Sequence, residues 1–119
     1  MRLTGSRTEI DFRDNLIKSH KELFTEKYEN LFMVLQEKFT EMKTAYFINH
    51  IPEQGEDLYT ILVNNDIIAK IEISRFNQDE KPIIEVYEVK DFNKGCSKMQ
   101  QIKLAVAIDL ALKDMEGTT

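Results

Sequence analysis

The chain has 119 residues, of which 42% are hydrophobic and 31% charged, and its formal net charge at pH 7 is −5. This size and composition predict a single domain over residues 1–119 with a proper hydrophobic core, and they exclude a disordered tail. The single cysteine excludes an internal disulfide framework, and no apolar run is long enough to span a bilayer. The acidic balance argues against a nucleic-acid partner.

Residues 1–7 read "MRLTGSR" and lack the apolar stretch of a signal peptide, so this segment is expected to be flexible. Together with the single cysteine, this predicts a cytoplasmic protein without a membrane partner. Lysine, isoleucine and asparagine are abundant. Such a composition is typical of an AT-rich genome, as in a low-GC bacterium or its phage.

The first half of the chain is predicted to be helical. Thr8 reads as the N-cap, and apolar residues recur at helical spacing over residues 16–42. An unbroken helix over residues 9–43 would be about 50 Å long, whereas a domain of this size is only about 35 Å across. Either the helix breaks, with Thr25 restarting it, or one end protrudes and finds a partner.

Four runs rich in β-branched and aromatic residues follow, at residues 45–51, 58–63, 67–76 and 83–89. The polar turns between them are short enough for hairpins and too short for crossover helices. We therefore expect a four-stranded antiparallel meander. The third run alternates isoleucine or alanine with lysine, glutamate or serine, which predicts a strand with one solvated face.

Residues 97–115 are predicted to form the last helix, which starts at a capping box of Ser97 and Gln100. Its apolar residues form two arcs, and a helix that is apolar on two sides needs cover on both. The fold class is thus α+β, with a long N-terminal helix (broken or continuous), the meander and a C-terminal helix. The helices are expected to pack on one face of the sheet.

Cys96 directly precedes this last helix, where the helix dipole and nearby lysines can lower the pKa of a thiol. The capping box accounts for the same residues without any chemistry. With two histidines and one cysteine, no recognised metal-ligand spacing exists, and no cofactor motif is present. We predict no enzyme activity, no metal and no cofactor. The alternative is a small-ligand binder or enzyme that uses Cys96 or His50 in a pocket against the sheet.

Carboxylates are concentrated in two turns that should share one end of the meander. This acidic rim comprises Glu53, Glu56, Asp57, Asp79 and Glu80. It either keeps the surface soluble or docks a basic partner. In the last helix Asp109 interrupts the apolar sequence, and Lys113 follows at the spacing of an i, i+4 ion pair.

The sequence predicts a non-catalytic protein-binding module, a small regulator, inhibitor or adaptor, that forms a homodimer. It has no catalytic constellation or basic patch, and it has more apolar helix surface than a compact monomer needs. The expected interface is the second arc of the last helix and one apolar residue on the polar side of the first. These residues are Met99, Ile102, Val106 and Leu110, together with Met33.

Overall fold

A computed structural model of the chain describes residues 3–76 and 79–117. Its elements in chain order are α1 Arg7–Glu22, the 3-10 helix η1 Glu26–Tyr28, α2 Glu29–Lys38, β1 Ala45–Glu53, β2 Glu56–Val63, β3 Ile67–Ser74, β4 Ile83–Glu88, α3 Val89–Lys94 and α4 Lys98–Glu116. The strands form one sheet in the order β1-β2-β3-β4, and each neighbouring pair is antiparallel. The predicted α+β class and meander are confirmed, whereas the short α3 was not foreseen.

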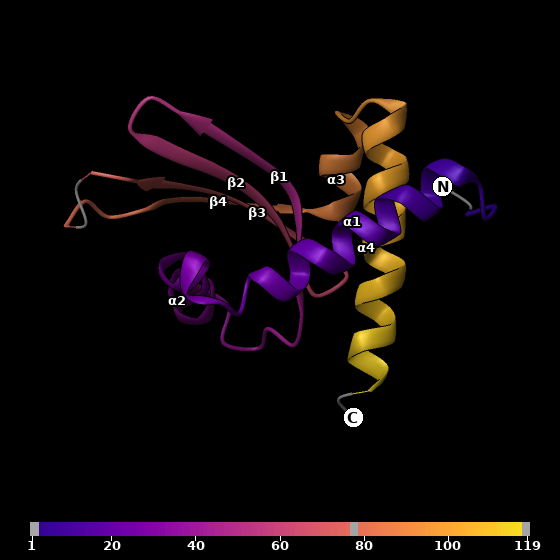
Figure 1. Cartoon of the computed structure of the whole chain (residues 1–119), viewed down its shortest axis with the longest axis horizontal. Coiled ribbons are helices and arrows are strands. Elements are labelled where there is room, and N and C mark those ends of the chain that lie inside the picture. The colour runs from indigo at the N-terminus through magenta and orange to yellow at the C-terminus, as the bar shows by residue number, and fades with distance from the viewer. Residues whose placement is uncertain (1–2, 77–78, 118–119) are drawn as a thin grey trace.

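The N-terminal helical material breaks at Thr25, which confirms the first of the two alternatives. Thr25 has extended backbone, with φ −97° and ψ 167°, and it separates α1 from η1 and α2. Leu16 of α1 packs in one core cluster, and Leu23, just after α1, packs in another. The helix therefore passes the β1 edge of the sheet on its way from α4 towards α2, as Figure 1 shows.

Helices cover both faces of the sheet, and the expectation that they pack on one face was wrong. Tyr46 and Ile48 of β1 join the cluster beneath α1 and α4, while Ala45 and Phe47 join the cluster beneath α2. We call these two sides the α4 face and the α2 face. The reason for the difference is that the inner ends of the strands are apolar at successive positions, so that both faces must be buried.

A β-bulge in β1 decides which side chains reach each face farther along the strand. The register between β1 and β2 shifts by one residue between Phe47 and Asn49. Beyond the bulge, His50 lies opposite Tyr59 on the α2 face, and Ile51 is therefore on the α4 face.

The helix α4 has the predicted N-cap, because Ser97 Oγ accepts a hydrogen bond from the Gln100 N–H at 3.2 Å. The arc expected to bind a partner, however, lies largely inside the chain. Val106 is 0% exposed and Leu110 is 9% exposed, and both belong to the core of the α4 face. Ile102 is half-buried, and Met99 is the exposed member of the arc. The fold itself uses the apolar surface that had suggested an interface.

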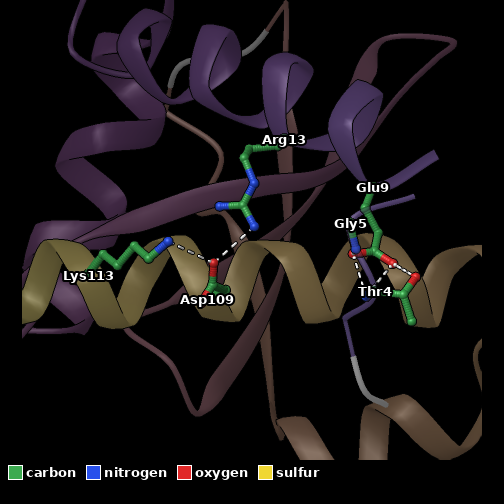
Figure 2. Close-up of polar contacts among 6 residues, drawn as sticks. All are labelled: Thr4, Gly5, Glu9, Arg13, Asp109 and Lys113. Atoms are coloured by element: carbon green, nitrogen blue, oxygen red, sulfur yellow. Dashed lines mark hydrogen bonds and ion pairs between the residues drawn. The ribbon is translucent and has the colours of Figure 1, made fainter. Parts of the chain in front are cut away.

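Polar contacts fix α1 against α4 (Figure 2). Asp109 Oδ2 lies 2.9 Å from a guanidinium nitrogen of Arg13 and 3.3 Å from the Lys113 ammonium, so the predicted i, i+4 ion pair is confirmed. Burial alone would raise the pKa of Asp109. The hydrogen bonds from Arg13 and Lys113 outweigh this effect and hold the pKa below its usual value.

The helix α1 is capped by Ser6 and not by Thr8 as expected, because the hydroxyl of Ser6 accepts a hydrogen bond from the N–H of Glu9. The Glu9 carboxylate in turn accepts hydrogen bonds from the backbone N–H groups of Thr4 and Gly5 (Figure 2). These bonds lower the pKa of Glu9 to about 2. The flexibility expected for residues 1–7 stays a prediction, and residues 1–2 lie outside the described part of the chain.

Replacing Val106 with Glu should unfold the protein, because it buries a charge without a partner. The cost approaches the whole stability of a domain, about 5–15 kcal/mol. Met99→Glu is the matched control in the same arc, and since Met99 is 54% exposed it should leave the fold intact. Circular dichroism and urea unfolding measure both, and a folded Val106→Glu protein would contradict the burial of the arc.

Glu9→Gln should make the protein less sensitive to acid. Because the pKa of Glu9 is lowered from 4.5 to about 2, its ionised form stabilises the fold above pH 4.5. This contribution is lost as the pH falls towards 2. Urea unfolding at neutral and acidic pH should show the Gln variant less stable than the wild type at pH 7, with the difference shrinking in acid. A constant difference would refute this role of Glu9.

Candidate functional site

The α4 face of the sheet is covered by helices over only part of its length. α1 and α4 pack over the end where Tyr46, Leu62 and Ile68 lie, and the turn between β1 and β2 lies at the opposite end of the sheet (Figure 1). The strand register places the remaining side chains of this face in rows beyond the cover. We name this region the open sheet face, and it consists of Ile51, Glu53, Glu56, Leu58, Thr60, Lys70, Glu72, Ile83 and Glu85.

One row of the open sheet face is apolar except at β3. Ile51, Leu58, Glu72 and Ile83 are successive partners across the four strands. Ile51 is 52% exposed and Ile83 is 56% exposed. The row lines a shallow hollow of about 320 Å³. Large apolar side chains gathered on an exposed sheet surface are typical of an interaction site.

Four carboxylates lie in or beside the apolar row. Glu53 and Glu56 lie directly opposite each other at the hairpin end, and such facing like charges cost stability. Glu72 and Glu85 lie on β3 and β4 of the same face. The open sheet face therefore has apolar side chains at Ile51, Leu58 and Ile83 and a negative net charge around and between them.

Lys70 is the one basic member of the open sheet face. Its ammonium lies 5.4 Å from the ring centroid of Tyr87 and 5.6 Å from that of Phe92. Both rings pack against the core of the α4 face. The positive charge is thus held at the inner border of the open sheet face, next to the covered half.

The two turns of the predicted acidic rim do share one end of the sheet, because the Arg75 N–H donates to the Gly55 carbonyl at 2.8 Å. The rim is nevertheless divided between two faces and a loop. Glu53 and Glu56 belong to the open sheet face, Asp57 belongs to the α2 face, and Asp79 and Glu80 are exposed in the turn before β4.

Asp57 and Tyr59 hold His50 on the α2 face. His50 Nε2 lies 3.0 Å from Asp57 Oδ1, and its ring stacks on Tyr59 with centroids 4.5 Å apart. Arg75 lies 3.7 Å from the second oxygen of Asp57. Burial, and then the charge of Asp57, raise the pKa of Tyr59 to about 12. His50 is part of a surface network of paired charges and stacked rings.

Cys96 follows α3, and its thiol donates a hydrogen bond to the carbonyl oxygen of Phe92 at 3.4 Å. Burial raises the pKa of the Cys96 thiol, and the charge of Lys70 offsets this only in part. The thiol is therefore less nucleophilic at neutral pH than an ordinary exposed one. Cys96 lies with Phe92 on the α4 side and His50 on the α2 face, so the structure does not bring the two residues of the alternative site together.

Met33 is 53% exposed on α2 and lines a hollow with Ile73 and Pro82. It lies on the α2 face and is not part of the open sheet face. Sequence reasoning missed Ile51, Leu58 and Ile83. Neither β2 nor β4 alternates apolar with polar residues, so the sequence does not mark Leu58 or Ile83 as facing solvent, and Ile51 reaches this face only because of the bulge.

Within residues 3–76 and 79–117, no group of three or more His, Cys, Asp or Glu side chains is arranged to hold a metal ion. No helix in the same part of the chain is long and apolar enough to cross a membrane. Comparison with protein-family models, with curated proteins and with solved structures finds no match.

Proposed function

We propose that this protein is a non-catalytic protein-binding module, a small regulator, inhibitor or adaptor, and that its partner binds the open sheet face. The observation that supports this is the exposure of Ile51 and Ile83, each more than half accessible, in one row with Leu58. Burying one such side chain contributes about 1.5–3 kcal/mol, so the row can supply a large part of a binding energy.

The shape of the surface favours a macromolecular partner. Small-molecule sites enclose most of their ligand and contain a few convergent polar groups. The hollow here is shallow and spread over four strands, with Glu72 and Glu85 as its carboxylates. Lys70, its basic residue, is engaged with aromatic rings. Such a surface can recognise a protein by area and charge.

Ile51→Thr and Ile83→Thr should each weaken partner binding at least about fivefold, because each removes buried apolar area. Threonine keeps the β-propensity of the strand, so the thermal unfolding midpoint should hardly change. Val86→Thr is the matched control, since Val86 is 45% exposed in the same strand as Ile83 but on the α2 face. Affinity capture with the wild type and the three variants, quantified by mass spectrometry, measures the effect.

A partner that depends on Ile51 and Ile83 and is indifferent to Val86→Thr supports the proposal. If the three variants retain everything that the wild type retains, the open sheet face is not the docking site.

We also propose that the protein forms a homodimer, now through the edge of β4 because Val106 and Leu110 are buried. The Val89 N–H donates to the Asp66 carbonyl at 3.0 Å. By the alternation of an antiparallel ladder, the N–H and C=O groups of Val86, and of the residues two positions before and after it, point away from β3.

A second copy paired antiparallel about Val86 gives a favourable register. Glu85 then lies opposite Tyr87, and Ile84 lies opposite Glu88, so no two carboxylates face each other directly. Pro82 and the glutamates disfavour indiscriminate strand addition at this edge. In the two-fold register the carboxylates of Glu85 and Glu88 do not face each other, so repulsion between the two copies is small.

Light scattering over a range of micromolar concentrations should therefore give a mass that rises above 14.0 kDa. Val86→Pro should stay at the monomer mass, because it removes an outward N–H while sparing the ladder to β3. Val86→Thr should still dimerise. A wild type that remains at 14.0 kDa throughout would end the homodimer proposal.

A further inference from the structure

From the charges of the open sheet face we infer that its occupant is a basic amphipathic segment of another protein. This inference rests on the proposed function and adds the chemistry of the partner. Of the nine residues that define the face, Glu53, Glu56, Glu72 and Glu85 are acidic and Lys70 is basic. The surface therefore attracts cations and repels phosphate groups.

The carboxylates of the open sheet face have few cations of their own nearby. Lys70 is held over the rings of Tyr87 and Phe92, away from the hairpin end. Arg75, which follows the last residue of β3, pairs with Asp57 on the α2 face, and its guanidinium reaches the backbone carbonyls of the β1–β2 turn.

The lysines of the neighbouring helix α3 are also engaged with nearby acids. Lys90 lies 3.4 Å from Glu88, and Lys94 lies 3.8 Å from Asp91. Lys81 is exposed just before β4 at one corner of the face. Even when Lys81 is counted with it, the open sheet face has a formal net charge of −2, from four glutamates and two lysines.

Glu53 and Glu56 form a cross-strand pair of like charges. Like charges directly opposite each other destabilise a hairpin, and strands normally place complementary charges there. A lysine or arginine of a partner placed between the two carboxylates would replace this repulsion by attraction. The acidic pair costs the free protein stability that a basic partner restores on binding.

The apolar side chains of the row are spaced to fit a short helix. Strands lie about 4.8 Å apart, so the row from Ile51 on β1 to Ile83 on β4 is about 14 Å long. An amphipathic helix presents apolar side chains at i, i+4 and i+7, over about 10 Å. Two to three helical turns with apolar residues on one stripe and basic residues beside it match both the row and its acidic surround.

The test uses two synthetic amphipathic peptides of about 15 residues, long enough to form the two to three helical turns that span the row. Both carry the same leucine stripe, one with lysines and the other with glutamates at the remaining positions. Fluorescence anisotropy with the full-length protein should show the lysine peptide bound at low salt. The affinity should fall as salt is added, and the glutamate peptide should bind at least about tenfold more weakly.

Two quadruple variants distinguish the effect of the carboxylates on the open sheet face from the effect of the protein's overall charge. Glu53→Gln, Glu56→Gln, Glu72→Gln and Glu85→Gln together neutralise the open sheet face. Glu26→Gln, Glu29→Gln, Glu37→Gln and Glu41→Gln remove the same number of exposed carboxylates around α2. The first variant should bind the lysine peptide roughly tenfold more weakly, and the second should change binding by less than about twofold.

Equal weakening by the two quadruple variants would overturn the inference, because overall charge would then explain the binding. If the glutamate peptide binds as well as the lysine peptide and Ile83→Thr weakens both, the basic partner is wrong but the docking face stands. If no peptide binding responds to Ile51→Thr or Ile83→Thr, the inference and the proposed function both fail.

Discussion

The break at Thr25 is the constraint on which the rest of the arrangement depends. A single straight helix over residues 7–38 would be about 48 Å long and could lie along one face of the sheet only. The longest extent of the molecule is 45 Å. The extended backbone at Thr25 redirects the chain, so that α1 joins α4 on one side of the sheet while α2 lies on the other.

The helices on the two sides of the sheet cover different lengths of the strands, and this difference determines which residues are exposed. The α2 face is buried well out along the strands, at Tyr59 and Ile71. On the α4 face, burial extends only to about Leu62 and Ile68. Beyond them the sheet presents isoleucine, leucine and glutamate to solvent. The open sheet face thus exists because the strands extend beyond the helices that cover the α4 face.

The sequence was sufficient to predict the helices and strands, but it did not predict how the helices pack against the sheet. Some signals depend only on neighbouring residues. Ser97 predicted the start of α4 correctly, and the short polar turns predicted the hairpins of the meander. The burial of Val106 depends on how α4 packs in the cluster shared with α1 and the sheet, and helical periodicity does not specify that packing. Ile51 lies on the open sheet face because of the β-bulge in β1, and the residues around the bulge give no sequence signal for it. Cover on both faces could have been suspected from consecutive apolar residues at the start of β1.

The bulge in β1 makes the composition of the open sheet face sensitive to the length of this strand. Because side chains alternate along a strand, deleting a single residue near Ile48 would turn the outer part of β1 over. The imidazole of His50 would then point to the side of the glutamates, and Ile51 would pack towards Tyr28 and Tyr59. Homologues could keep every residue of the surface and still lose it through one deletion, so an insertion or gap at this position would say more about shared function than percentage identity.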